Sequence, residues 1–503
     1  MSEIQVFNTL SKQKEPFKPI NGNKVHMYAC GPTVYDMSHL GHARMAIVWD
    51  VVQRYLRFSG FDVTYVRNVT DVDDKIIKRA KELGVQPDKV AREYTYTFWN
   101  DMHRLNVQPP DFEPRCTEYI SLMIEFIEDL IEKKHAYESD GDVYFDVNSF
   151  KDYGKLGNKT VEDLLVGARE DQVRSQDSLK ERKKSPVDFA LWKGAPDTEP
   201  GWSSPWGHGR PGWHLECSTM IKHVLGETID IHAGGEDLVF PHHENEIAQS
   251  NSLHSKPLAK YWLHNSFVKV NAEKMSKSLG NFSTIDGLLG SFSADTIRLF
   301  ILQTHYRHPI DFSIDSLKGA ASAMGRLLRA SSYAPQKDAE DQQKNGIPEA
   351  LSAPIFGDKM LERSPHVTAD KMEQLDKEQD EVTKAFRKEF VDSMNNDFNT
   401  AAAISSLFQL AEKIFQLKDD DEKKKSYAQI LRDHARVLGL IMEDHRHFLD
   451  AKTSGKVVDL VLSLRDRART NKDYQASDLI RDELGNLGIS VMDSKDGASW
   501  ERS

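Results

Sequence analysis

The chain has 503 residues and a formal net charge of −12 at pH 7, with 39% hydrophobic and 29% charged residues. This length predicts two to four domains rather than one core, and the apolar content is sufficient for packed interiors. The acidic balance argues against indiscriminate binding of nucleic acid, which normally leaves a basic footprint.

A strand, a helix and a second strand are predicted near the N-terminus. Residues 25–30 favour an apolar strand that ends at Gly31, and apolar residues recur at helical spacing from Leu40 to Phe58. Residues 61–66 predict the second strand. Two strands joined by a helix imply a parallel sheet with a ligand crevice at the strand ends, so we expect an α/β fold with a Rossmann-like catalytic domain.

Farther along the chain, the patterns predict an inserted subdomain and then a mostly helical half. The insertion spans about 116–212, and the polar segment at about 334–380 indicates a linker between helices. We predict the following domains: a catalytic domain at 1–315 with a junction at about 262–315, an α-helical bundle at 316–452, and a small C-terminal domain at 453–503 that begins with a hinge at 453–455.

Two motifs suit the handling of phosphate. His39, Gly41 and His42 stand where the first helix begins, and a helix N-terminus favours phosphate; the alternative is a helix start with two exposed histidines. Lys274 and Lys277, in the run K-M-S-K-S, can stabilise charge on a reacting α-phosphate, although a solvated basic loop would look the same. In this order, the two motifs resemble the paired signature of class I aminoacyl-tRNA synthetases. The resemblance implies that both histidines and both lysines are catalytic, and that Gly41, His39, His42 and Lys277 bind ATP, which would carry Mg²⁺.

A second group of residues suits a metal. Cys30 follows the first strand, Cys217 lies far downstream, and His242 and Glu246 are four residues apart, so they share one face if they lie on a helix. Two sulfurs, one nitrogen and one oxygen form a ligand set that zinc accepts. The alternative is that the cysteines are small core residues and that the other two are an ordinary helical pair.

The resemblance becomes specific in seven runs spread over the whole chain. The runs YACGPTVYD, HLGHAR, NVTDVDDKI, GRPGWHLECS, GGEDLVFPHHENEIAQ, KMSKSLGN and MNNDFNT are similar, in order and approximate spacing, to those of cysteinyl-tRNA synthetases. This implies activation of L-cysteine by ATP and its transfer to the 3′ terminal adenosine of tRNA(Cys). It also implies that Cys30, Cys217, His242 and Glu246 bind one zinc ion, which selects the thiolate of the substrate over the hydroxyl of serine.

The same resemblance implies a pocket for the amino acid and a site for the anticodon. The positions that match the amino-acid pocket are Gly31, Thr70, Trp213 and Asp237. The positions that match anticodon contacts, in the C-terminal anticodon-binding domain, are Arg469, Asp478, Asp493 and Trp500. Arginines and aromatics in this tail suit unstacked bases, and a charged amphipathic helix is the alternative. Cys116 and His243 match no functional position and are interpreted as structural.

The expected partners are tRNA(Cys), L-cysteine and ATP. We expect a monomer in the cytoplasm, because the three cysteines are too few and too distant for a disulfide framework, which indicates a reducing compartment. We expect no membrane span, because no apolar run reaches the roughly 18 residues that one needs. Lys75 and Lys78 resemble a lysine motif that some family members use with pyridoxal phosphate to make cysteine persulfide; two solvated helical lysines are the alternative.

Two rival functions fit part of these features. A cysteine ligase that acts on an amino-sugar in thiol biosynthesis would keep the ATP motifs and the zinc ligands but needs no anticodon domain. A non-catalytic tRNA-binding protein descended from a synthetase would not need to keep the ATP motifs and the zinc ligands intact. The helical C-terminal half argues against the first rival, and the intact motifs argue against the second.

Overall fold

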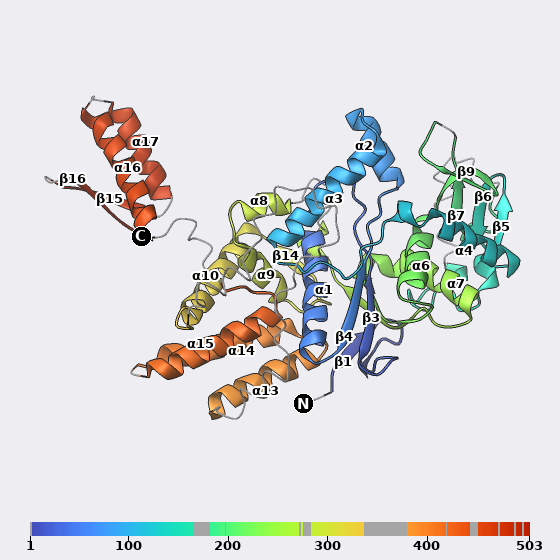
Figure 1. Cartoon of the computed structure of the whole chain (residues 1–503), viewed down its shortest axis with the longest axis horizontal. Helices are drawn as coiled ribbons and strands as arrows, with labels where there is room; N and C mark the ends of the chain where they lie inside the picture. The colour runs from blue at the N-terminus through green and yellow to red at the C-terminus, as the bar shows by residue number, and fades with distance from the viewer. Residues whose placement is uncertain are drawn as a thin grey trace. The chain divides into compact units, whose positions relative to one another are not determined.

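The computed structural model describes most of the chain. The described residues are 3–163, 182–196, 198–270, 273–274, 283–335, 380–418, 420–442, 451–470, 473–486, 489–494 and 497–502. They form two compact units, Met1–Met442 and Glu443–Ser503, which Figure 1 draws from blue to red along the chain. The predicted linker at 334–380 lies almost entirely outside the described residues, and residues 164–181 of the predicted insertion lie outside them as well.

A parallel sheet of four strands forms the centre of the first unit, in the order β11-β10-β3-β4. The strands are β3 (Lys24–Ala29), β4 (Asp62–Arg67), β10 (Ile229–Gly235) and β11 (Ala259–Asn265). The chain leaves β3 toward β4 on one side and leaves β10 toward β11 on the other. The strand order therefore reverses between β3 and β10, and in open α/β sheets ligands bind at such a point. The predicted α/β class is confirmed.

Helices connect the strands of this sheet. They are α1 (Leu40–Phe58) between β3 and β4, α6 (Trp213–Val224) before β10, and α7 (Glu244–His254) between β10 and β11. The imidazole of His39 caps α1 by accepting from the Gly41 amide at 3.1 Å, and the His39 amide donates to Nδ1 of His42 at 3.2 Å. Both predicted phosphate-handling histidines thus also define where the helix begins.

An antiparallel sheet of five strands lies within the stretch predicted as an insertion, in the order β5-β6-β7-β9-β8. Its strands are β5 (Ala136–Ser139), β6 (Asp142–Phe145), β7 (Phe189–Gly194), β8 (Trp202–Ser204) and β9 (Gly207–Pro211), and α4 (Ile120–Glu132) precedes them. The helices α2 (Asp74–Leu83) and α3 (Pro87–Arg104) form a hairpin that projects from the unit in Figure 1. Near the N-terminus, β1 (Gln5–Asn8) pairs with β2 (Gln13–Pro16).

Among the residues described after β11, those at 266–335 form a small sheet in the order β13-β12-β14 and three helices. The strands are β12 (Val268–Val270), β13 (Glu273–Lys274) and β14 (Ile310–Phe312), and the helices are α8 (Ile285–Leu289), α9 (Ala294–Leu302) and α10 (Ile314–Ser331). The helices α13 (Glu381–Asn395), α14 (Thr400–Gln416) and α15 (Asp421–Val437) pack with α10 into a bundle. No helix among the described residues has the length and apolar character needed to cross a membrane.

One hydrophobic core lies beneath α1 and continues into the bundle. Trp49 and Leu56 of α1, Phe390 of α13, Leu407 of α14 and Leu431 of α15 are all buried in it. Figure 1 shows α1 between the sheet and the helices α13–α15, and α1 contacts both β4 and α15. The sheet and the bundle therefore pack against the same hydrophobic core.

A buried carboxylate fastens the turn between α13 and α14, within the run MNNDFNT, to the rest of this unit. Oδ1 of Asp397 accepts from the Phe7 amide at 2.8 Å and from the Tyr306 hydroxyl at 2.7 Å, and Oδ2 accepts from Nε of Arg307 at 2.7 Å. A fully buried charge is tolerated only when it is paired and hydrogen-bonded, and these three donors meet that requirement. This turn therefore anchors the bundle to β1 and to the loop between α9 and β14.

A buried histidine in the bundle should make this unit sensitive to acid. The ring of His434 packs against those of Phe386 and Phe390, and burial lowers its pKa to about 3. The folded state keeps this imidazole neutral, whereas the unfolded chain protonates it below about pH 6.5, so stability is lost as the pH falls from about 6.5 toward 3. We expect about 2 kcal/mol of such loss between pH 7 and 5. His434→Leu should abolish this portion, measured by urea denaturation at both pH values; an unchanged pH dependence in the variant would contradict the assignment.

The second unit contains α16 (Ala451–Thr470), α17 (Tyr474–Asn486) and the antiparallel strands β15 (Ile489–Ser494) and β16 (Gly497–Arg502). Residues 453–455, where we predicted a hinge, lie inside α16. A single glycine costs a helix interior only about 1 kcal/mol, so Gly455 is a weak signal for a break.

Candidate metal and nucleotide site

The four predicted metal ligands converge at the ends of β3 and β10. Cys30 directly follows β3, Cys217 lies on α6, and Glu246 lies in the first turn of α7. His242 lies in the short helical turn Val239–His243 that precedes α7. All four side chains are buried, and one ligand atom from each lies within 4.8 Å of the others. The structure therefore brings together residues from three distant stretches of the sequence.

The distances between these ligand atoms suit a tetrahedral ion. Zn–S bonds of about 2.3 Å place two sulfurs about 3.8 Å apart in a tetrahedral site. The Sγ atoms of Cys30 and Cys217 are 3.8 Å apart, and Sγ of Cys217 is 3.7 Å from Nε2 of His242. Oε1 of Glu246 is 3.0 Å from that nitrogen and 3.8 Å from Sγ of Cys30. The donor set and its spacing fit zinc.

Two further histidines reach the same cluster. Nε2 of His243 is 3.3 Å from Sγ of Cys30, and Nε2 of His232 is 2.7 Å from Oε2 of Glu246. These four residues form a second set whose ligand atoms lie within 4.8 Å of one another. Nothing in the sequence assigns a role to His232, and the sequence alone gives His243 a structural interpretation. In the sequence, His232 shows only its position in a strand, and His243 shows only that it is the second histidine of P-H-H-E-N. Neither signal predicts that the two side chains converge on this cluster.

Aromatic side chains that belong to neither ligand set orient the rings of His242 and His243. The ring of Trp213 stacks on His242 with centroids 4.2 Å apart, and Nδ1 of His214 is 3.0 Å from Nδ1 of His242. On the other side, Nε2 of His264 is 2.8 Å from Nδ1 of His243. Contacts of this kind set the ring orientation and the tautomer of ligating histidines.

Burial controls the protonation of this cluster. It raises the pKa of the Cys30 thiol well above its ordinary value, with Cys217 and Glu246 adding to the effect. It lowers the pKa of His242 well below its usual range and that of His214 to about 3. The imidazoles of His242 and His214 are therefore neutral at pH 7, the form that binds a cation, and a metal ion has to displace protons from thiols.

The H-x-G-H motif lies at the N-terminus of α1. The rings of His39 and His42 stack with centroids 4.0 Å apart. The Leu40 amide donates to the Ser283 carbonyl at 3.2 Å, so the residues that follow the K-M-S-K-S run are bonded to this motif. Lys277 lies outside the described residues. The backbone of Lys274 belongs to β13, and its side chain is not described.

Three of the predicted amino-acid pocket residues lie beside the metal cluster. The Gly31 amide donates to Oδ1 of Asn68 at 2.8 Å, and a Cβ atom at position 31 would lie 1.6 Å from the Asn68 carbonyl oxygen, so only glycine fits there. The Thr70 hydroxyl donates to Oε2 of Glu216 at 2.9 Å, and Glu216 precedes Cys217. Trp213, the third, stacks on His242. Asp237 lies in the turn Glu236–Leu238 that follows β10. Asn68 and Glu216 lie within the family-like runs NVTDVDDKI and GRPGWHLECS, but nothing in their residue type or spacing predicts their contacts with Gly31 and Thr70.

The predicted anticodon residues lie in the second unit. Arg469 near the end of α16 and Asp478 on α17 have exposed side chains. Asp493 lies in β15 and Trp500 in β16, which pair with each other; the side chains of these two residues are not described.

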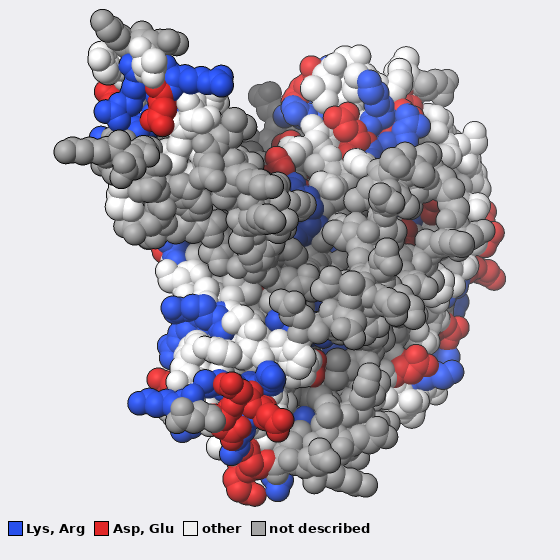
Figure 2. Space-filling model, turned by 60° about the vertical axis from the view of Figure 1, so that its left-hand side comes forward, with Lys and Arg blue, Asp and Glu red and all other residues white. Residues whose placement is uncertain are grey.

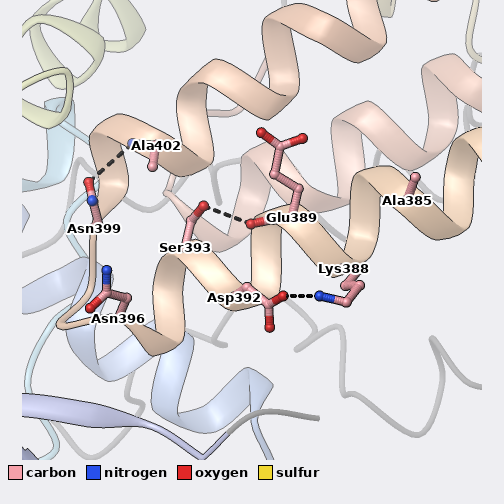
Figure 3. Close-up of a pocket in the computed structure, with 8 residues that line it drawn as sticks. All are labelled: Ala385, Lys388, Glu389, Asp392, Ser393, Asn396, Asn399 and Ala402. Atoms are coloured by element: carbon pink, nitrogen blue, oxygen red, sulfur yellow. Dashed lines mark hydrogen bonds and ion pairs between the residues drawn. The ribbon is translucent and has the colours of Figure 1, made fainter.

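A surface hollow lies on the bundle, away from the predicted site residues, between α13 and α14 (Figure 3). Its polar groups already pair with one another: Nζ of Lys388 is 2.5 Å from Oδ2 of Asp392, and the Ser393 hydroxyl donates to the Glu389 carbonyl at 2.7 Å. On the face drawn in Figure 2, described lysine and arginine side chains stand beside aspartate and glutamate side chains. Neither feature indicates a ligand.

Comparisons with known proteins extend over both units. The family model described as the class I (C) catalytic domain of tRNA synthetases matches residues 16–322. A DALR domain matches residues 389–443, and the cysteinyl-tRNA ligase anticodon binding domain matches residues 456–500. The cysteine–tRNA ligase of Bacillus pumilus is 44% identical over 503 residues, 99% of each chain. That of Heliobacterium modesticaldum is 44% identical over 509 residues, covering 99% of this chain and all of the relative.

Solved structures share the fold at low sequence identity. Methionyl-tRNA synthetase of Mycobacterium tuberculosis, in complex with methionyl-adenylate, has a TM-score of 0.55 and 16% identity, and the match covers 88% of this chain and 94% of that chain. A parallel sheet with H-x-G-H at the start of its first connecting helix and the catalytic-domain match define a class I aminoacyl-tRNA synthetase. Within that class, the chain belongs to the cysteinyl-tRNA synthetase family, as its full-length relatives show.

Proposed function

We propose that this enzyme joins L-cysteine to the 3′ terminal adenosine of tRNA(Cys) in two steps, the first of which consumes ATP. The observation that carries the proposal is the convergence of Cys30, Cys217, His242 and Glu246 at the point where the strand order of the sheet reverses. This convergence supports a thiol-selecting site, because ligands of open α/β sheets bind where the strand order reverses. Membership of the family supports the same conclusion.

In the first step, a carboxylate oxygen of cysteine bonds to the α-phosphorus of ATP, and the bond from that phosphorus to the oxygen of pyrophosphate breaks. His39 and His42 donate to the phosphate oxygens, where charge develops, and the amides at the N-terminus of α1 favour the same charge. Gly41 lets the nucleotide approach the backbone. Lys274 and Lys277 are proposed to stabilise the charge from the K-M-S-K-S side, and Mg²⁺ accompanies the ATP. In the second step, a ribose hydroxyl of tRNA(Cys) attacks the carbonyl carbon of the adenylate and AMP leaves.

Zinc held by the four ligands would supply a Lewis acid that favours a thiolate over a neutral hydroxyl. Two residues of the chain position one of these ligands, because Trp213 stacks on His242 and His214 lies 3.0 Å from it, and all four ligand side chains are buried. Gly31, Thr70, Trp213 and Asp237 are proposed to surround the amino acid. Serine differs from cysteine by one atom, so an ordinary pocket would discriminate poorly between them.

The C-terminal unit favours tRNA over an amino-sugar as the acceptor. An amino-sugar ligase needs no counterpart of the anticodon binding domain that matches residues 456–500. Arg469, Asp478, Asp493 and Trp500 are proposed to contact the anticodon. We further propose the domain limits given above, a monomer in the cytoplasm, and pyridoxal phosphate at Lys75 and Lys78 only as a side activity.

Cysteine-dependent exchange of pyrophosphate into ATP, zinc content and charging of tRNA(Cys) test this function together. We expect about one zinc ion per chain, exchange with cysteine but not with serine, and charging of tRNA(Cys). Exchange without charging would favour the amino-sugar ligase, and absence of exchange with cysteine would overturn the proposal.

A further inference from the structure

The run K-M-S-K-S begins at Lys274 of β13, and described residues before and after the run are attached to α1 or to the residues that begin it. On the far side of the run, the Leu40 amide donates to the Ser283 carbonyl at 3.2 Å and the Ile285 amide donates to the Ser38 carbonyl at 3.0 Å. His39 and Thr284 form an antiparallel bridge at the same place. The backbone itself therefore makes this attachment.

On the near side, one side chain makes the attachment. Arg44 lies on α1 two residues after His42, and the residue is 1% exposed. Nη1 donates to the carbonyl of Phe267, the residue before β12, and Nη2 donates to the carbonyls of Tyr306, at 3.0 Å, and His308. Three carbonyls from two segments thus converge on one planar group, which suits the fixed fork of arginine and not the point charge of lysine.

The carbonyls that Arg44 holds belong to a rigid frame. The Ser266 amide donates to the Tyr306 carbonyl at 2.9 Å, and the Ile310 amide donates to the Phe267 carbonyl at 3.0 Å. These bonds lead into the parallel pair β12 and β14. From the other side, the hydroxyl of Tyr306 donates to Asp397 of the bundle. Because this frame is fixed, the position of Arg44 determines where β12 stands relative to α1.

The strand β12 pairs with β13, the strand that contains Lys274, through Lys269 opposite Lys274 and Val270 opposite Glu273. We propose that Arg44 is a positioning residue for the reaction with ATP: it fixes β12, and with it β13, against the helix that begins at His39 and His42. This inference rests on the proposed function, because it takes the distance between β13 and the start of α1 to serve the reaction with ATP. Arg44 itself touches no reacting atom.

Arg44→Lys tests this inference, because lysine keeps the charge but loses the fork. In pyrophosphate exchange we expect the KM for ATP to rise at least about tenfold, while the KM for cysteine stays within twofold and the zinc content is unchanged. Hydrogen exchange should rise in peptides that contain the Ser266 and Ile310 amides. It should not rise at Leu40 and Ile285, which the backbone attachment protects.

Arg298→Lys is the matched control. Arg298 is also buried and donates to three carbonyls, those of Leu105, Asn106 and Leu438. It differs in one further bond, to Oδ2 of Asp50 on α1 at 2.7 Å, and it contacts neither attachment. This variant should lose thermal stability and leave the KM for ATP within twofold. An Arg44→Lys variant with an unchanged KM for ATP, or one in which both substrates and the control shift alike, would overturn the inference. If the wild-type chain does not exchange pyrophosphate with cysteine, the proposed function fails, and the pattern of hydrogen exchange still shows whether Arg44 fixes β12.

Discussion

Cys30→Ser should leave the protein folded but without bound zinc, and its kcat/KM for cysteine should fall by more than about 100-fold. Loss of an outer contact to a metal ligand typically costs 10–100-fold in affinity or activity, so loss of a ligand itself should cost at least about that much. A serine hydroxyl does not replace a thiolate, because zinc favours the soft sulfur ligand. Zinc content by elemental analysis and the pyrophosphate exchange rate at varied cysteine concentrations measure the two effects.

The third cysteine of the chain provides the control. Cys116 is buried in the same apolar core as Cys30 and Cys217 but belongs to neither ligand set. Cys116→Ser should therefore keep its zinc and its cysteine activation. Equal loss in both variants would show that Cys30 acts through packing, and full activity of zinc-free Cys30→Ser would remove zinc from the proposed mechanism.

His42→Gln should lower the kcat of cysteine-dependent pyrophosphate exchange by about 100- to 1,000-fold, the cost typical of losing one donor to developing charge. The KM for cysteine and the zinc content should stay close to wild type, because His42 belongs to neither metal ligand set. Glutamine is chosen since it accepts from the cap amide at this position of a helix, as His42 does from His39. The substitution thus removes the imidazole and keeps the cap.

His39→Asn serves the same purpose at the other histidine. Asparagine is among the best residues for a helix N-cap, so the bond that His39 accepts from Gly41 is retained. Both variants should melt within a few degrees of wild type and fail in the exchange assay. Activity close to wild type in both would reduce the two histidines to helix-capping residues.

The sequence predicted the class of fold because its signals are local. The alternation before Gly31, the helical spacing from Leu40 and the next apolar strand make up one continuous βαβ unit. The sharing of a core between α1 and the bundle could not be predicted, because Trp49 and Leu431 show only that each helix has an apolar face. Which faces meet depends on contacts between residues nearly 400 positions apart.

The same contrast between local signals and long-range contacts applies to the site. Cys30, Cys217, His242 and Glu246 could be proposed as ligands from residue type and resemblance, and the structure shows their side chains converging. Their neighbours could not be proposed in this way. His232 lies in a buried strand, Arg44 lies inside a helix, and neither has a sequence neighbour that signals its partner. Their contacts arise from the crossing of distant elements, which no spacing along the chain encodes.

The common core also limits how small a working version of this enzyme can be made. A fragment that stops after α10 would leave the apolar sides of α1 and α10 facing water and would remove Asp397, so Tyr306 and Arg307 would lose their buried acceptor. Such a fragment should aggregate. A cut after Met442 separates two units that each have their own packing. Minimal versions meant to activate cysteine without charging tRNA should therefore be shortened only from the C-terminal side of that residue.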